Sequence, residues 1–384
     1  MSPYRRAFAV ACVFAPLFYI YWWGLTKSSS ESRFLSEDVL NKTLGFSKIL
    51  VISLPSRSDR RDAMALAGAV TNFTFSWVDA VSGDQIEDLD ASLGNRMHSS
   101  GAKGSWRSHM NALQAVVENN LRSALIVEDD IDWDVRLKSQ LQIFASASRT
   151  WLKEAKSKKG TIQLDTSKHA DDRGHEAIYG DDWDVLWLGH CGTDFPPDNS
   201  QVPPLRVAIS GDDTVPAPKH LKPHPFALQD KLGELYPPHT RVIHASSGTV
   251  CSLAYAVSHQ GARRLLREFD SHYDTQWDLM LQKWCEGGYH RRSNLKSGLD
   301  TDDVTPEDQG VRPICVTVQP PLFSHHYAKR GVSNIQGQGG GYATGTGTPY
   351  IRFSVRENMN RLVAGAPASE MVDQLPDDGK PIWV

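Results

Sequence analysis

The acidic end of one apolar segment could hold a metal ion. Residues 125–127 are Leu, Ile and Val, a run typical of a buried strand, and Glu128, Asp129 and Asp130 follow directly. Like charges this close together must be offset by a cation or by water. In open α/β sheets, ligands bind beyond the carboxyl ends of the strands. The pattern therefore predicts a divalent metal ion at a sheet edge, with a phosphorylated ligand beside it. A solvated acidic turn with an Asp helix cap is the alternative interpretation.

Two kinds of reaction could use such an acid cluster. As ligands of Mn²⁺ or Mg²⁺, the carboxylates would hold a metal that neutralises a nucleotide diphosphate when its bond to a sugar breaks. A phosphatase of the dehalogenase type instead needs an Asp nucleophile, a second Asp two residues later and then Thr or Val. Here Asp130 and Asp132 are followed by Asp134, so the phosphatase reading is the weaker one. We expect Asp132 and Asp134 to be ordinary solvated acids.

A membrane anchor is predicted near the N-terminus. Residues 7–25 are apolar and uncharged, and a bilayer-spanning helix needs roughly 20 such residues. Arg5 and Arg6 precede the run, and the positive-inside rule predicts that residues 1–6 form a cytosolic tail. A cleaved signal peptide is the alternative.

The rest of the chain would then lie in the lumen of the Golgi or endoplasmic reticulum as a single-pass type II protein. Residues 26–46 are polar and read as a stem, and residues 47–384 as the luminal domain. Asn41 and Asn72 begin glycosylation acceptor sequences, which agrees with that location. The formal net charge of −4 argues against a nucleic-acid partner.

The cysteines leave their pairing open. One of the five, Cys12, lies in the predicted anchor. In an oxidising compartment the other four could form two disulfides by any of three pairings, with four buried thiols as the alternative. No Cys/His spacing suggests zinc. The four are Cys191, Cys251, Cys285 and Cys315.

Strand and helix patterns alternate along the chain. In the helix expected from Ser105 to Asn119, four apolar residues share one face: Trp106, Met110, Leu113 and Val117. Further helices are expected after Ser58, after Ser258 and around 277–284, and strands at 49–54, 73–78, 125–127, 183–189 and 250–257. This order predicts an α/β layered domain with a mainly parallel sheet. Irregular segments near 159–182, 194–240 and 328–349 are expected to be functional loops or disordered.

Six short blocks occur in a fixed order, at 51–61, 80–83, 101–109, 128–130, 187–189 and 254–266. They include an Arg-rich turn after the first strand, Ala-Val-Ser-Gly, Gly-x-x-Gly followed by Ser-His, and Glu-Asp-Asp. Together they resemble glycosyltransferase family 25, the lipopolysaccharide and procollagen galactosyltransferase type, over residues 48–335. Ser53 stands where the family usually has Asn, and Ser105 replaces Cys.

The resemblance implies a GT-A type fold, with a Rossmann-like, mainly parallel sheet flanked by helices. It implies a metal-dependent, inverting glycosyltransferase that moves a sugar, with galactose as the leading guess, from a UDP-sugar to a hydroxyl of a glycan, lipid or protein. The irregular insertions near 159–182 and 194–240 have no counterpart in the family pattern. The substitutions at Ser53 and Ser105 motivate an alternative, a donor-binding scaffold without catalysis.

The family blocks also supply the donor-binding candidates. The arginines could pair with diphosphate oxygens, the Ala-Val pair could lie against the nucleoside, and the Ser-His pair could bind the donor sugar or a phosphate. The alternatives are surface arginines, a plain turn and a histidine packed on a helix face. The candidates are Leu54, Arg57, Arg60, Ala80, Val81, Ser108 and His109.

Inverting transfer needs a base within hydrogen-bond reach of the acceptor hydroxyl. Asp278 is the first candidate, and Asp274 is expected one turn earlier on the same helix face or as its cap. A late His could complete the metal shell, which makes His325 and His326 candidates, with a surface pair as the alternative. Within the acid cluster, Glu128, Asp129 and Asp130 are the metal candidates.

Overall fold

A computed structural model describes residues 39–86, 99–165, 177–221, 231–270, 273–289, 312–327 and 347–380. None of the helices in these ranges is long and apolar enough to cross a bilayer. The predicted tail and anchor, residues 26–38 of the stem and, within the three irregular segments, residues 166–176, 222–230 and 328–346 lie outside them.

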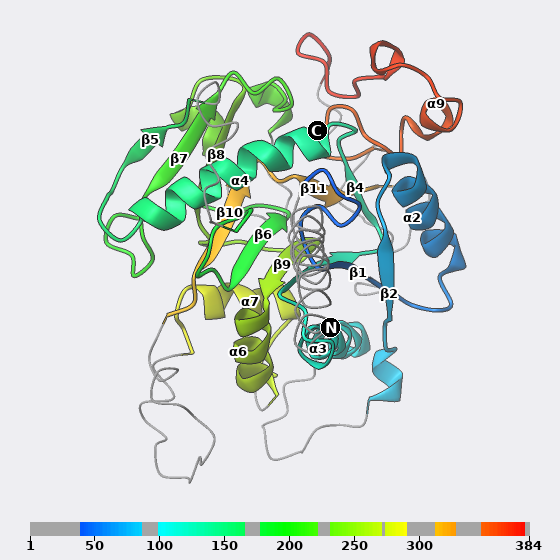
Figure 1. Ribbon diagram of the computed structural model, residues 1–384, viewed down its shortest axis with the longest axis vertical. Coiled ribbons are helices and arrows are strands. Elements are labelled where there is room, and N and C mark those ends of the chain that lie inside the picture. Colours follow the sequence, from blue (N-terminus) through cyan, green and yellow to red (C-terminus); the bar gives the residue numbers. More distant parts are fainter. Residues whose placement is uncertain are drawn as a thin grey trace, which may run out of the picture.

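One large sheet forms the centre of the molecule (Figure 1). Its main path runs β2-β1-β3-β9-β6-β10-β8-β7-β5, and β11 pairs with both β4 and β6. The strands are β1 Lys48–Ser53, β2 Phe75–Asp79, β3 Ser123–Glu128, β4 Ile131–Trp133, β5 Thr161–Gln163, β6 Val185–Gly189, β7 Arg206–Ser210, β8 Thr240–Ala245, β9 Ala254–Ser258, β10 Cys315–Gln319 and β11 Phe323–His325.

The sheet is mixed. β9 runs antiparallel to its neighbours β3 and β6, and β8 runs antiparallel to β10 and β7, whereas the other strands of the path share one direction. The α/β class is therefore confirmed, and the expected parallel arrangement is interrupted at two strands. The sequence-based prediction missed β7 because it lies in the Pro-rich segment that we read as irregular.

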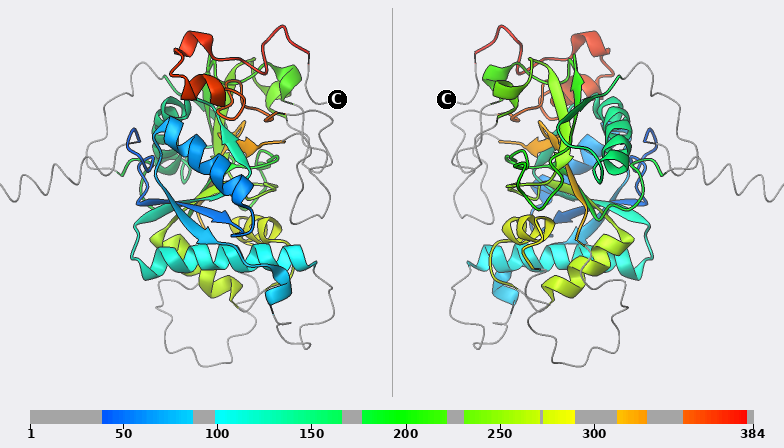
Figure 2. Two further views of the ribbon diagram at one scale, coloured as in Figure 1. Left: turned by 90° about the vertical axis from the view of Figure 1, so that its right-hand side faces the viewer. Right: turned by 90° about the vertical axis from the view of Figure 1, so that its left-hand side faces the viewer.

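Helices cover both faces of the sheet. They are α2 Ser58–Thr71, α3 Ser100–Glu118, α4 Leu137–Glu154, α5 Leu232–Leu235, α6 His259–Phe269, α7 Trp277–Cys285 and α9 Met359–Val363. Figure 2 shows α3 lying along one side of the sheet with α6 next to it. In Figure 1, α4 crosses the part of the sheet that contains β7 and β8.

The core has two apolar layers, one on each face. Trp106, Met110 and Leu113 of α3 are buried in the layer under α3, α6 and α7, as their spacing predicted, and Val117 is half-buried against it. The helix begins five residues earlier than expected because the Ser99 side chain caps it by accepting a hydrogen bond from the Ala102 N–H. Burying these side chains stabilises the fold by roughly 1.5–3 kcal/mol each.

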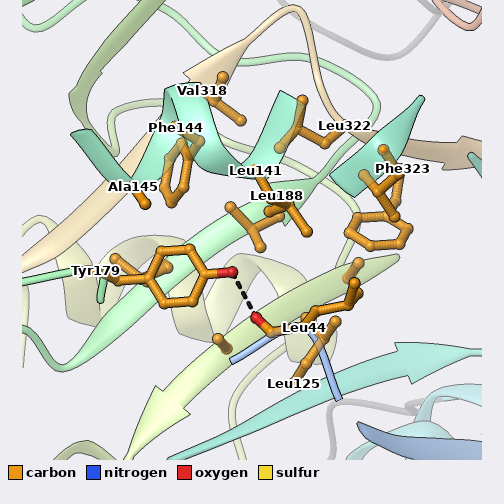
Figure 3. Packing of buried hydrophobic residues seen from close by; sticks show 14 of the residues in the cluster. Leu44, Leu125, Leu141, Phe144, Ala145, Tyr179, Leu188, Val318, Leu322 and Phe323 are labelled. Atoms are coloured by element: carbon orange, nitrogen blue, oxygen red, sulfur yellow. Dashed lines mark hydrogen bonds between the residues drawn. The ribbon is translucent and has the colours of Figure 1, made fainter. Parts of the chain in front are cut away.

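The opposite layer lies under α2 and α4 (Figure 3). Leu141 and Phe144 of α4 meet Leu125 and Leu188 of the sheet there, and the Tyr179 hydroxyl donates a hydrogen bond of 2.6 Å to the Leu44 carbonyl. Val39, Leu44 and Phe46 are also buried in this layer. The folded domain therefore includes the last residues of the segment that we predicted as a stem.

The segment of residues 347–380 packs against β4. Asp132 accepts hydrogen bonds from the Thr348 and Ser354 hydroxyls, and Asp134 accepts from the Phe353 N–H. Both carboxylates are fully buried. The expectation that Asp132 and Asp134 are ordinary solvated acids is therefore wrong, because residues more than two hundred positions later enclose them.

The four cysteines of the domain form two disulfides, Cys191–Cys251 and Cys285–Cys315. The first joins the loop after β6 to the loop before β9, and the second joins the end of α7 to the start of β10. The structure thus decides between the three pairings that the sequence left open.

Candidate active site

One cavity of about 490 Å³ lies where β1 and β3 end and α3 and α7 begin. Its lining brings together all but one of the residues that we predicted for donor binding, for the metal-binding carboxylates and for the base. These are Leu54, Arg57, Arg60, Ala80, Val81, Ser108, His109, Glu128, Asp129, Asp130 and Asp278. The exception is Asp274. Residues from five different stretches of the chain therefore converge on one concave site of the size that small-molecule ligands occupy.

Asp129 is held by two neighbours. The Ser53 hydroxyl donates to its Oδ2 at 2.7 Å, and Arg60 Nη1 donates to its Oδ1 at 2.9 Å. Burial and the adjacent Asp130 raise the pKa of Asp129, while Arg60 and Ser53 act in the opposite direction. Both carboxylate oxygens are thus engaged with the protein itself.

Asp130 is held differently. Arg60 Nη1 also donates to its Oδ2 at 2.8 Å, and His325 Nε2 lies 3.4 Å from the same oxygen. Burial works against the charged form, but His325 and Arg60 outweigh it and hold the pKa of Asp130 below its ordinary value. The other oxygen, Oδ1, is buried and has no hydrogen-bond partner among the described residues.

Glu128, the last residue of β3, has the opposite titration behaviour. Burial, and next the charge of Asp130, raise the pKa of Glu128 to about 8. The Ser252 hydroxyl donates to its Oε1 at 3.1 Å. The two ends of the acid cluster therefore differ, since Asp130 is charged near neutral pH and Glu128 is largely protonated below the pH of its raised pKa.

The predicted metal set of Glu128, Asp129 and Asp130 is not supported by this geometry. Within the residues that the structure describes, no group of three or more His, Cys, Asp or Glu side chains is placed to hold a metal ion. Arg60 supplies the cation that offsets Asp129 and Asp130. The run of three acids correctly predicted a positive charge nearby, but it could not show that an arginine from α2 provides this charge.

The two predicted arginines have different surroundings. Arg57 precedes α2 and forms a two-pronged pair with the exposed Asp59, through Nε at 2.8 Å and Nη2 at 2.7 Å. Arg60 is more buried and faces the acid cluster. Both guanidinium groups line the cavity, where a diphosphate could meet them.

Ser108 joins the start of α3 to the turn at residues 80–83. Its hydroxyl accepts a hydrogen bond from the Val81 N–H at 2.9 Å and donates to the Gly104 carbonyl at 2.6 Å. Gly83 and Gly104 permit this close packing, because a Cβ on Gly104 would lie 2.5 Å from the Val81 carbonyl oxygen. The Gly-x-x-Gly block thus lets the start of α3 contact the turn at residues 80–83.

His109 is packed in the cavity wall as a neutral imidazole. Its ring stacks on Trp277 at a centroid distance of 4.9 Å, and its Nδ1 is 3.0 Å from the Tyr255 hydroxyl. Burial lowers the pKa of His109 to about 3. Its Nε2 lies 3.9 Å from Glu128 Oε1. His109 therefore lies on a packed helix face and also borders the cavity.

The two candidate bases are separated by the fold. Asp278 lines the cavity in the first turn of α7, and its carboxylate accepts hydrogen bonds from the N–H groups of Cys251 and Leu279. Burial raises the pKa of Asp278. Asp274 lies before α7, whose N-cap is Gln276, and pairs with Lys283 and Tyr289. The expectation that Asp274 shares a helix face with Asp278, or caps the helix, is wrong.

Some lining residues carry no recognisable sequence signal. Cys191, Cys251 and Ser252 come from two loops and meet only through a disulfide and hydrogen bonds. His325, which the sequence offered as a candidate, lines the cavity, whereas His326 bonds to Thr348 beside Asp132. A single Ser or Cys in a loop does not reveal such a role without the fold.

Comparison with known proteins supports a sugar-transferring class. Two proteins named procollagen galactosyltransferase align with this chain. That of Danio rerio, procollagen galactosyltransferase 1, is 30% identical over 112 residues, which are 26% of this chain and 18% of the relative. Procollagen galactosyltransferase 1-A of Xenopus laevis is 25% identical over 182 residues, 44% of this chain and 25% of the relative. The matched region of this chain thus spans a quarter or less of these relatives.

The relatives that align with this chain are thus named as enzymes that transfer a sugar. The model of glycosyltransferase family 25 (LPS biosynthesis protein) matches residues 46–173, a third of the chain. That range contains β1 to β4, the Arg-rich turn, α3 and the acid cluster. The resemblance predicted from the six sequence blocks is therefore confirmed over this part of the chain.

Proposed function

We propose that this protein transfers a sugar, with galactose as the first candidate, from a UDP-sugar to a hydroxyl of a glycan, lipid or protein. One observation carries the proposal: a single cavity joins two arginines, the acid cluster, the start of α3 and the carboxylate of Asp278. The names of the aligned galactosyltransferases support the choice of sugar. A GT-A type arrangement and inversion at the anomeric carbon are parts of the same proposal.

In this proposal the donor lies across the ends of β1 and β3. The diphosphate is bound by Arg57, with Arg60 nearby, because guanidinium groups pair well with phosphate oxygens. The nucleoside lies against Ala80 and Val81, whose turn is fixed by the hydrogen bond to Ser108. Small side chains here allow a flat ring to approach the backbone.

A metal ion in this site would be held by Asp130 and His325. Oδ1 of Asp130 and Nδ1 of His325 are both buried and lack a hydrogen-bond partner among the described residues. Mg²⁺ is usually bound by only one or two carboxylates together with substrate phosphates, and Mn²⁺ prefers the same oxygen ligands. Such an ion would neutralise charge on the departing diphosphate. Asp129 is not proposed as a ligand, because Ser53 and Arg60 occupy both its oxygens.

Asp278 is proposed as the general base. Its partly buried carboxylate is oriented by two backbone N–H groups, and burial raises its pKa, which makes it a better proton acceptor. It would take the proton of the acceptor hydroxyl as the new bond to the anomeric carbon forms and the bond to UDP breaks. Glu128, whose pKa is raised to about 8, would be largely protonated at neutral pH and would therefore add no second negative charge near Asp278.

The experiment uses the full-length chain in detergent with UDP-sugars, an acceptor panel and Mn²⁺. Asp278→Asn should lower kcat by about 10²–10⁴-fold, as loss of a general base does. Asp274→Asn should retain most of the activity, since Asp274 does not line the cavity. Chelation by EDTA should abolish donor hydrolysis and transfer. Donor binding without any hydrolysis or transfer would instead favour the non-catalytic scaffold, and no donor binding at all would overturn the proposal.

We also propose a type II topology in the Golgi or endoplasmic reticulum. The uncharged apolar run at 7–25, the two disulfides and the exposed Asn72 support it. Protease protection of the domain in sealed microsomes, together with a mobility shift after endoglycosidase treatment, tests this topology. Digestion of the domain in intact microsomes would contradict it.

A further inference from the structure

A strip of three residues, Cys251 to Leu253, contacts the carboxyl groups of Asp278 and Glu128 in the cavity. The Cys251 N–H donates to Asp278 Oδ2 at 2.8 Å. The Ser252 hydroxyl donates to Glu128 Oε1, and the Glu128 N–H donates to the Leu253 carbonyl at 3.0 Å. The position of this strip therefore determines where both carboxyl groups lie.

The strip is anchored by the Cys191–Cys251 disulfide. Both cysteines line the cavity, and the backbone around them forms a short bridge in which the Cys191 N–H donates to the Val250 carbonyl at 2.9 Å. On the other side, Trp187 Nε1 donates to the Cys251 carbonyl at 3.0 Å. The disulfide thus connects the end of β6 to the residue whose N–H holds Asp278.

The backbone of Cys251 needs such an anchor. Its φ is +64°, in the left-handed region that residues with a side chain rarely adopt. That conformation costs of order 1–3 kcal/mol for a residue other than glycine and persists only where neighbours enforce it. It also aims the Cys251 N–H at Asp278. Without the disulfide, relaxation of Cys251 would turn this N–H away from the carboxylate.

We propose that the Cys191–Cys251 disulfide is a positioning element for Asp278, so that catalysis depends on its being oxidised. The inference rests on the proposed function, in which Asp278 is the base. It assigns the disulfide a role in the reaction beyond joining two loops. Reduction to two thiols would leave the donor-binding arginines in place and misplace the base.

The second disulfide provides a matched control. Cys285–Cys315 also joins two elements of the domain and is also buried, but neither cysteine lines the cavity or bonds to Asp278. Its removal should reduce stability, but Cys285 lies at the opposite end of α7 from Asp278, whose carboxylate keeps its hydrogen bonds to Cys251 and Leu279. The two pairs therefore separate loss of stability from loss of position.

The test compares Cys191→Ser/Cys251→Ser with Cys285→Ser/Cys315→Ser in the full-length chain. The first variant should lose about tenfold to a hundredfold in kcat, the size of effect that small misplacements of a catalytic group produce. Its KM for the UDP-sugar should stay within about twofold, since donor binding is unchanged. The control variant should show a lowered Tm but a kcat close to that of the wild type.

A second measurement covers the case in which the first variant does not fold. The control variant retains Cys191–Cys251 as the one disulfide of the described residues, so dithiothreitol can reduce that bond in the native protein. Loss of kcat should follow the alkylation of Cys191 and Cys251 measured by mass spectrometry and should reverse on reoxidation. A full kcat in the folded Cys191→Ser/Cys251→Ser variant, or in the reduced control, would overturn the inference. Full activity of Asp278→Asn would instead overturn the proposed base.

Discussion

The hydroxyl of Ser53 donates a hydrogen bond of 2.7 Å to Oδ2 of Asp129. The two residues lie at the ends of β1 and β3, which are adjacent and parallel, and the register that pairs Ile52 with Glu128 brings them side by side. This contact, together with Arg60, engages both oxygens of Asp129. Asp129 is thereby a structural member of the acid cluster, and Asp130 is the member with an oxygen left for a ligand.

Replacing Ser53 by Ala should destabilise the domain. The change leaves a buried carboxylate oxygen without its donor, which costs about 1–3 kcal/mol, or more for a charged group. Urea unfolding measures the loss. Ser56→Ala is the control, because Ser56 is exposed and should change stability by no more than about 0.5 kcal/mol. Equal stability of the two variants would show that the Ser53 contact contributes nothing.

Arg60→Met should be far more damaging to stability than Arg57→Met. Arg60 pairs with both Asp129 and Asp130 and is only 17% exposed, so its loss removes the guanidinium partner of two buried carboxylates, at a cost of about 3–5 kcal/mol. The Arg57–Asp59 pair is open to water, and such pairs contribute about 0–1 kcal/mol. Thermal unfolding of the two variants checks the order. A larger loss for Arg57→Met would contradict the role given to Arg60.

Arg356 braces the backbone on both sides of Asp130. Its Nη2 donates to the Asp129 carbonyl at 3.0 Å and its Nε to the Ile131 carbonyl at 2.8 Å. We expect Arg356→Met to weaken UDP binding in the presence of Mn²⁺, because it removes the two hydrogen bonds that hold the backbone around Asp130. Hydrogen bonds that involve a charged group stabilise the folded state by about 1.5–3 kcal/mol each. Isothermal titration calorimetry measures the change.

The control for that variant comes from the same segment. Arg352 pairs with Asp373 through Nε and Nη2, and Arg352→Met should lower Tm and leave UDP affinity unchanged. If both variants bind UDP as tightly as the wild type does, residues 347–380 support the fold only.

The buried His190 should make stability depend on pH. Burial lowers its pKa from 6.5 to about 4, so between those values the unfolded chain binds a proton that the folded protein does not. The stability associated with His190 is complete above pH 6.5 and is lost as the pH falls toward 4, by about 1.4 kcal/mol per pH unit.

His190→Gln removes this titration and keeps a donor for the Val318 carbonyl, to which His190 Nε2 bonds at 2.8 Å. The free energy of unfolding, measured by urea at several pH values below that of an unperturbed His, about 6.5, should therefore fall less steeply in the variant. Parallel curves for the wild type and the variant would rule out the depressed pKa.

Much of the site could be predicted because its signals are local in the chain. The face of α3 follows from the spacing of Trp106, Met110 and Leu113, since a helix repeats every 3.6 residues whatever surrounds it. The end of β3 can be predicted because apolar residues 125–127 are followed directly by Glu128, Asp129 and Asp130. The family resemblance named Arg57, Arg60, Ser108 and Asp278 as site candidates, and the structure brings all four together in one cavity.

The sequence by itself determined which chemical groups the site contains: two arginines, a run of carboxylates and an Asp in a later helix. Only the tertiary structure decided what each group touches. Arg60 neutralises the acids, Asp132 is enclosed by Thr348 and Ser354, and Cys251 pairs with Cys191 and holds Asp278. The reason is physical, because burial and hydrogen bonding depend on residues 27 to 222 positions apart, and no local pattern encodes which distant segment will cover a given side chain.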